Sequence, residues 1–240
     1  YALGIAEAAL SMGAKLYENS SALSYKVFDD HVRVTTKNGS VKADRIVLAC
    51  NGYLENLEKS LTSKILPMNN YIVATKPLDD ETVQKINPKD IAFADSRFVI
   101  NYFRMSADKR LLFGGGENYS QELSKNIVPI VTRPLEKIYP FLKGIKIDYA
   151  WGGKLAITMN RLPFFTTLKN DRVISAQGYS GQGVALASYS GKIVSEKILG
   201  SGKTFDLMAK IPRQSFPGGR FLRNPSMKLG MLYYSLLDRI

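Results

Sequence analysis

The segment that decides the fold is Ala176–Leu199, which reads AQGYSGQGVALASYSGKIVSEKIL. A short apolar run ends in the first residues of this segment. Three glycines then fall within six residues: Gly178, Gly181 and Gly183. Apolar residues at helical spacing follow, so the segment predicts a buried strand over 172–177, a glycine turn and a helix over about 183–199. Such a turn presents backbone N–H groups at the positive end of a helix, where a planar or anionic group can approach closely.

The spacing of these glycines bears on what the turn binds. Their order is G-x-x-G-x-G, which is neither the G-x-G-x-x-G of dinucleotide-binding folds nor a phosphate-binding loop with its Lys-Ser/Thr pair. A phosphate site is therefore not supported. Tight packing of the strand against the helix, without any ligand, is the alternative that the pattern alone leaves open.

The composition excludes several kinds of site. The chain has 240 residues and a formal net charge of +12, with Cys50 as its single cysteine and His31 as its single histidine. An internal disulfide, a multi-cysteine metal site and a Ser-His-Asp triad are therefore excluded, and we expect no metal. We see neither a signal-peptide pattern nor an apolar run long enough to span a membrane, so we expect a cytoplasmic protein.

The first part of the chain predicts α/β structure. A helix is expected over 1–13, a short strand over 15–17, and then a three-stranded meander with a hairpin turn at Asn38-Gly39. The meander leads into the run 46–50, which is apolar on both faces, as in a buried parallel strand. That strand ends at Asn51-Gly52.

The middle of the chain predicts an antiparallel sheet with a covering helix. A helix interrupted by prolines is expected over 122–142. Strands are expected in NNYIVATKPL (69–78), SRFVINYFRM (96–105), KRLLFGGG (109–116) and KIDYAWGGKLAIT (146–158). The fold class is therefore α/β plus α+β.

Three stretches carry a resemblance to a known family: WGGKLAITMNRLPFF (151–165), AQGYSGQGVALASYSGKIVSEKI (176–198) and FPGGRFLRNPSMKLGMLYYSLLDRI (216–240). They resemble the C-terminal portion of FAD-dependent amine oxidoreductases of the D-amino-acid oxidase superfamily. The resemblance implies a partial, Rossmann-like FAD-binding domain over 1–65 and 155–240, and an antiparallel-sheet substrate domain over 66–154. The N-terminal βαβ unit, which binds the FAD pyrophosphate in this superfamily, is expected to be absent.

The resemblance also implies which residues bind FAD, and that they bind it noncovalently. The N–H groups at the helix start would lie near N1 and O2 of the isoalloxazine ring, where reduction places negative charge. Many relatives have His at the position of Gln182. The glutamine side chain can donate a hydrogen bond, but unlike histidine it cannot carry a positive charge. The implied cofactor-binding residues are Ser21, Ala22, Cys50, Asn51, Gly52, Gly178, Tyr179, Ser180, Gly181, Gln182, Gly183 and Val184.

The substrate pocket is expected in the antiparallel part. Tyr102 and Arg104 share one face of their strand, and Trp151 and Lys154 lie in a later stretch. The resemblance implies that a cation near Lys154 holds the substrate carboxylate, and Lys154 could so hold a gamma-glutamyl carboxylate of a polyamine conjugate as a point charge. Core aromatics and solvated charges are the alternative for all four residues. The implied reaction moves a hydride from the carbon beside a primary or secondary amine to flavin N5, with reoxidation by O2. No residue needs to act as a general base, so no catalytic residue is assigned.

Two alternatives to a flavoenzyme stay open. A noncatalytic fragment or interaction module without the phosphate anchor would expose a large apolar surface. A basic protein of nucleic acid or membrane surfaces would use the tail from Ser201, with seven Lys/Arg against two Asp/Glu. We favour an amine-oxidising flavoprotein that binds no nucleic acid, and whose FAD site an N-terminal half or a second chain completes.

Overall fold

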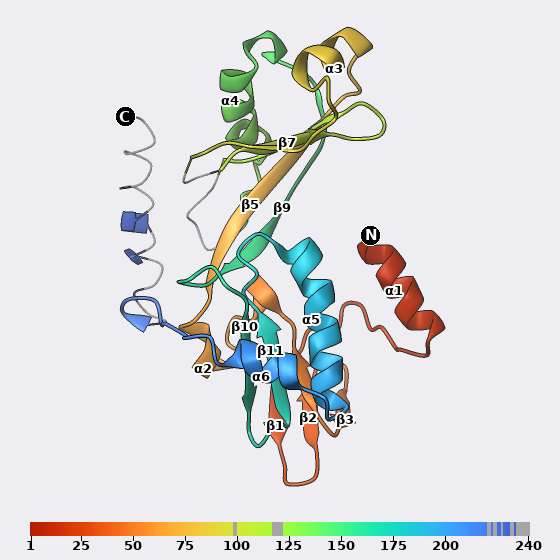
Figure 1. The fold of residues 1–240 in the computed structure, drawn as a ribbon, viewed down its shortest axis with the longest axis vertical. Coiled ribbons are helices and arrows are strands. Elements are labelled where there is room, and N and C mark those ends of the chain that lie inside the picture. Colours follow the sequence, from red (N-terminus) through yellow and green to blue (C-terminus); the bar gives the residue numbers. More distant parts are fainter. Residues whose placement is uncertain are drawn as a thin grey trace. The chain divides into compact units, whose positions relative to one another are not determined.

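The computed structural model describes residues 1–97, 100–116 and 122–219, and the positions 222, 225, 226, 228–230 and 233. The chain divides into two compact units (Figure 1). One consists of Tyr1–Leu48 and Thr166–Ser175, and the other of Ala49–Phe165 and Ala176–Ile240. The predicted boundaries of the FAD-binding and substrate domains stay predictions.

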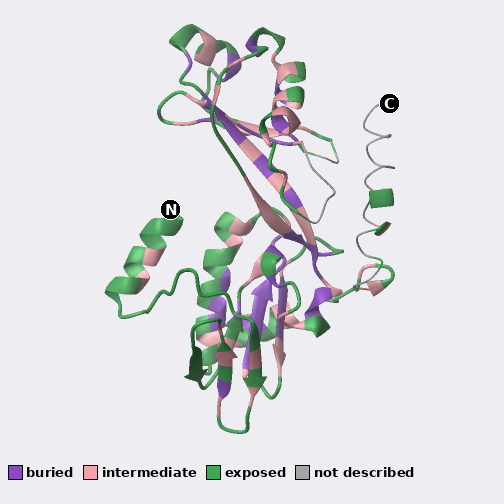
Figure 2. Ribbon diagram, turned by 180° about the vertical axis from the view of Figure 1, so that it is seen from behind, coloured by how far each residue is buried: buried purple, intermediate pink, exposed green. Residues whose placement is uncertain are grey.

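The first unit contains the predicted helix and meander. Helix α1 (Ala2–Ser11) has no buried residue (Figure 2). The meander follows as β1 (Ser24–Val27), β2 (Val32–Thr35) and β3 (Ser40–Ala43), with antiparallel pairing throughout. The prediction of a strand over 15–17 is wrong, because these exposed residues pair with no strand in the described part of the chain.

The first unit also holds the predicted parallel strand. β4 (Ile46–Leu48) pairs in parallel with β11 (Val173–Gln177), in a sheet of order β10-β11-β4 that includes β10 (Phe164–Leu168). β11 is buried at every position, whereas Val47 of β4 is 39% exposed. The prediction of a parallel strand is confirmed, but its burial on both faces is wrong.

The second unit is built on a five-stranded sheet of order β6-β7-β8-β5-β9, antiparallel throughout. Its strands are β5 (Leu66–Thr75), β6 (Phe93–Ala94), β7 (Tyr102–Met105), β8 (Leu111–Gly114) and β9 (Ile147–Ile157). β5 starts earlier than predicted and includes Pro67. Proline is tolerated there because β8 pairs only with Ile72–Ala74, so Pro67 has a strand neighbour on one side only.

One face of this sheet forms the core with helix α4 (Val128–Ile138). The helix is shorter than the predicted 122–142, because Pro129 stands at its start and Pro140 begins a separate 3-10 turn, η2 (Pro140–Leu142). The short helices α2 (Lys59–Thr62) and α3 (Asp80–Ile86) were not predicted. Asp79 caps α3, since its carboxylate accepts a hydrogen bond from the N–H of Thr82 at 2.8 Å.

The predicted C-terminal helix is confirmed as α5 (Gly183–Ile198), and α6 (Lys203–Ala209) follows it. Lys197 and Asp206 join the two helices by an ion pair of 2.9 Å. Only part of the predicted apolar face of α5 is covered. Ile193 and Val194 are buried, whereas Val184 is 76% exposed.

Candidate functional site

Three segments of the second unit meet around the glycine turn. They are the 3-10 turn η1 (Asn51–Tyr53), the end of β9, and the turn 178–182 that leads into α5. The side-chain oxygen of Asn51 accepts a hydrogen bond from the N–H of Gly178 at 3.1 Å. The N–H of Ser180 donates to the carbonyl of Ala156 at 2.9 Å. The turn is therefore fixed to both other segments by its own backbone.

The conformation of the turn requires glycine at two positions. Gly178 has φ +79°, and a Cβ there would lie 2.6 Å from the methyl carbon of Thr158. Gly181 has φ +94°, and a Cβ there would meet nothing within 4 Å. Glycine is thus required at 178 both by the positive φ and by the lack of room for a Cβ. At 181 it is required by the positive φ alone, and the residue borders open space.

The start of α5 presents a positive dipole to this open space. The first N–H groups of a helix have no acceptor within the helix. At α5 no side chain caps them, and no acidic residue stands in the first turn. Gly181, Gln182 and Val184 are exposed. The site therefore offers hydrogen-bond donors and partial positive charge to a planar, electron-rich group.

The 3-10 turn η1 comes close to the β9 backbone. A Cβ at Gly52 would lie 2.5 Å from the carbonyl oxygen of Lys154, so only glycine allows this approach. The hydroxyl of Tyr53 accepts a hydrogen bond from the N–H of Lys154 at 3.0 Å. Cys50 is half-buried, and this burial raises the pKa of its thiol. Its thiol therefore stays protonated near neutral pH, which makes it a poor nucleophile.

The predicted cofactor-binding residues differ in where they point. Asn51, Gly52 and the residues 178–184 lie together at this site. Tyr179 packs inward, where its hydroxyl donates to the carbonyl of Ala176 at 3.0 Å and its burial raises its pKa. Ser21 and Ala22 are exposed residues of the other unit, ahead of β1.

The four pocket candidates fall on both faces of the five-stranded sheet. The register aligns Tyr102 with Gly114, Gly114 with Ile72, and Ile72 with Trp151, so these side chains share one face. Arg104 is on the same face, two residues beyond Tyr102. Lys154 pairs with Asn69, three residues from Ile72 along β5, and so belongs to the opposite face.

Lys154 is engaged by the loop that follows η1. Its ammonium lies 3.5 Å from the carboxylate of Glu55 and 5.7 Å from the centre of the Tyr53 ring. Only 20% of its side chain is exposed. The sequence analysis did not single out Tyr53 or Glu55, because nothing in their local pattern marks a contact with Lys154, about a hundred positions away. It also missed Thr158, which lies against the glycine turn about twenty positions on.

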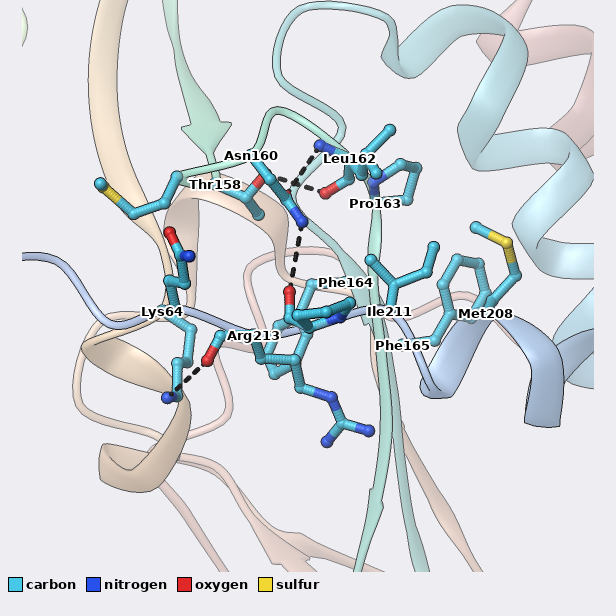
Figure 3. A pocket seen from close by; sticks show the side chains of 13 residues that line it. Lys64, Thr158, Asn160, Leu162, Pro163, Phe164, Phe165, Met208, Ile211 and Arg213 are labelled. Carbon is cyan, nitrogen blue, oxygen red and sulfur yellow. Dashed lines mark hydrogen bonds between the residues drawn. The ribbon is translucent and has the colours of Figure 1, made fainter.

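A separate small pocket, partly open to solvent, adjoins Thr158 (Figure 3). Its two cationic side chains have partners within the lining itself: Lys64 donates to the carbonyl of Arg213 at 3.1 Å, and the Arg213 guanidinium lies 5.6 Å from the centre of the Phe164 ring. No cluster of metal-ligating side chains occurs among the residues the structure describes. Across the same residues, no helix is long and apolar enough to cross a membrane.

Comparison with known proteins agrees with this architecture. The chain is 40% identical over 237 residues to the probable oxidoreductase OrdL of Rhizobium meliloti (strain 1021), covering 99% of this chain and 55% of the relative. It is 35% identical over 240 residues to the gamma-glutamylputrescine oxidoreductase of Escherichia coli (strain K12), covering 100% and 56%. The chain spans a little over half the length of these relatives.

The structural comparison gives the same fold. The glycine oxidase from Geobacillus kaustophilus superposes with a TM-score of 0.70 at 20% identity, over 89% of this chain and 57% of that one. This similarity confirms the predicted α/β plus α+β fold class. Residues 1–197 match the family described as DAO, FAD dependent oxidoreductase, and the predicted resemblance is thereby confirmed. The chain belongs to this family of FAD dependent oxidoreductases.

Proposed function

We propose that the protein oxidises the C–N bond of a primary or secondary amine with FAD, and that O2 reoxidises the cofactor. The observation that carries the proposal is the glycine turn: Gly181 borders open space beside the exposed, uncapped N-terminus of α5. Such a site suits a ring system that gains negative charge on reduction.

The residues present fit a noncovalent FAD. Asn51, Gly52, Ser180, Gly181 and the first N–H groups of α5 would hold it. When bound, FAD accepts the hydride from the carbon beside the amine nitrogen. The chain's own residues orient the reactants and supply hydrogen-bond donors. The half-buried thiol of Cys50, with its raised pKa, supports noncovalent rather than thioether attachment.

The substrate proposal is a gamma-glutamyl conjugate of a polyamine. It is supported by the relative that carries gamma-glutamylputrescine in its name. We further propose that an N-terminal half or a second chain completes the FAD site, since the chain covers 55–56% of its curated relatives. A cytoplasmic location also stays a proposal.

The first experiment is the visible spectrum of the purified protein before and after addition of FAD. We expect a red-shifted flavin band near about 450 nm that stays with the protein through gel filtration. The variant Gly178→Ala should lose most of this band, because the added Cβ collides with Thr158. Gly191→Ala, in the middle of α5 with nothing within 4 Å of its Cβ position, is the matched control and should keep it.

An amine screen under air, followed by detection of hydrogen peroxide, then tests the reaction. A protein that binds FAD but produces no peroxide with any amine would contradict amine oxidation. A colourless protein that does not bind FAD, either alone or when mixed with an N-terminal half from a relative, would favour the noncatalytic interaction module.

A further inference from the structure

The chain segment that follows α6 is the strongest feature that the proposed function does not use. Segment 211–216 lies against the turn that joins β9 to β10 (Figure 3). Asn160 of this turn donates a hydrogen bond from its side-chain nitrogen to the carbonyl of Pro212 at 3.2 Å. Lys64, just after α2, donates to the carbonyl of Arg213 at 3.1 Å. Segment 211–216 therefore joins the β9–β10 turn to the end of α2.

Segment 211–216 is fixed at both of its ends. At the far end, the N–H of Phe216 donates to the carbonyl of Ser63 at 2.9 Å, and the hydroxyls of Ser63 and Ser215 lie 3.4 Å apart. Ahead of the segment, the buried ring of Phe205 in α6 packs edge-on against that of Phe165 in β10, with 5.6 Å between the ring centroids. The segment is therefore a fixed support for the turn that contacts it.

The β9–β10 turn depends on side-chain hydrogen bonds for its shape. The side-chain oxygen of Asn160 accepts from the N–H of Leu162 at 3.1 Å, while its nitrogen donates to Pro212. The hydroxyl of Thr158 donates to the carbonyl of Leu162 at 2.8 Å. Arg161 has φ +59°, a conformation that a residue with a Cβ seldom adopts. Asn160 thus stabilises the turn from within and also joins it to segment 211–216.

Thr158 connects this turn to the glycine turn. Its N–H donates to the hydroxyl of Ser180 at 3.3 Å, and its methyl carbon leaves no room for a Cβ at Gly178. Thr158 is also buried, so it cannot move without a shift of the glycine turn. Direct contacts therefore run from segment 211–216 through Asn160 and Thr158 to the glycine turn.

We propose that Asn160 is a positioning residue for FAD binding. By joining the β9–β10 turn to segment 211–216, it keeps the glycine turn in the conformation that accepts the flavin ring. This inference rests on the proposed function, because it takes the glycine turn as the FAD site. Asn160 acts through Thr158, and it makes the affinity for FAD depend on Pro212, 52 positions later in the chain.

The test compares Asn160→Ser with Asn126→Ser, and neither substitution changes the net charge. A serine hydroxyl at position 160 can still accept from the N–H of Leu162, but it is too short to reach Pro212. The variant therefore removes the contact with segment 211–216 and keeps the local turn. Asn126 is exposed ahead of α4, so its variant makes the same chemical change outside these contacts.

The first measurement is the dissociation constant of FAD, in the form of the protein that binds FAD in the spectral experiment. We expect Asn160→Ser to raise this constant about tenfold, and Asn126→Ser to change it by less than about twofold. Lys64→Met removes a different contact of segment 211–216 and leaves those of Ser63, so its effect should be about twofold to threefold.

The second measurement is amide hydrogen exchange of the FAD-free protein. The N–H groups of Gly178 and Ser180 are hydrogen-bonded within the site, so their exchange reports how firmly the glycine turn is held. We expect Asn160→Ser to exchange about tenfold faster over 176–184, with β5 and the midpoint of urea unfolding nearly unchanged. An equal increase over β5 would show a general loss of stability and would overturn the inference.

The two measurements separate this inference from the proposed function. If the wild type binds FAD and Asn160→Ser binds it equally well, the inference is overturned and the proposed function stands. If the wild type binds no FAD but exchange over 176–184 still rises in Asn160→Ser alone, the proposed function fails, and Asn160 remains the residue that positions the glycine turn.

Discussion

On one face of the five-stranded sheet, Tyr71, Val73 and Phe113 are fully buried in the core with helix α4, whereas on the other face Trp151 is 44% exposed. Both faces belong to the same strands, so local backbone preference is the same for each. The covered face contains apolar side chains that pack against one another. The open face, which lies opposite α4, mixes aliphatic, aromatic, polar and basic side chains, and the hydroxyl of Tyr53 from η1 lies near it at Gly153.

The difference between the two faces shows that one face of a sheet can stabilise the fold while the other face stays accessible to a ligand. The covered face contributes Tyr71, Val73 and Phe113 to a hydrophobic core of the second unit, and their burial stabilises the fold. The open face is then free to carry Arg104 without an acidic partner in the described structure, since it does not have to hold the sheet together. Substitutions on the two faces should therefore have different effects, and the predictions below test that expectation.

The largest effect is expected from Phe113→Ala. Phe113 is fully buried and its ring stacks on that of Phe103 at 5.4 Å between centroids. We expect this variant to lose about 3–5 kcal/mol of the free energy of unfolding, measured by urea denaturation. The matched variant on the open face, Trp151→Ala, should lose less than about 1 kcal/mol. Equal losses would show that the open face is packed and cannot serve as a binding surface.

The sequence already contained most of the information about which elements form. The glycines of 178–183 and the Asn38-Gly39 pair act within a few residues, so their turns and the adjoining elements were predicted correctly. The short strand predicted over 15–17 failed because a strand needs a neighbour, and no local pattern shows whether one is present. Likewise, the proline pattern of 122–142 gave the helix but not its bounds.

The candidate site was predictable in part. The contacts of Gly178 with Asn51, and of Lys154 with Tyr53, join residues more than a hundred positions apart, and no spacing in the sequence specifies them. By contrast, the sequence did specify that Trp151 and Lys154 lie on opposite faces, because residues three apart in a strand point to opposite faces. The alternation of β9 therefore held a signal that the grouping of both residues into one pocket overlooked.

An intermediate effect is expected from Gly114→Ala on the open face. A Cβ at Gly114 would overlap the Tyr102 ring, so the ring must move and its hydrogen bond to Asn70 is lost. We expect a loss of about 1–2 kcal/mol in the free energy of unfolding. Gly153→Ala is the control on the same face, since its nearest neighbour is the Tyr53 hydroxyl at 3.5 Å. Identical stability of the two variants would mean that Tyr102 is not fixed by Gly114.

The smallest effect concerns Arg110, the arginine whose charge is compensated. The hydrogen bond from Arg110 lowers the pKa of Asp148, and Lys146 at 3.3 Å acts in the same direction. Since the folded pKa is below the unfolded value of about 3.9, the unfolded chain takes up the proton first as the pH falls. The stabilisation is therefore complete above that value and is lost as the pH falls through the folded pKa.

Urea denaturation of the wild type and Asp148→Asn between pH 7 and pH 3 measures this contribution. We expect the variant to be less stable by a constant amount from about pH 7 to 5, and the difference to shrink below about pH 4. Asp44→Asn, which removes an exposed carboxylate without an ion pair among the described side chains, is the matched control for the loss of one negative charge. If the Asp148→Asn difference instead grew on acidification, Arg110 would not be held by Asp148, and its contrast with Arg104 would disappear.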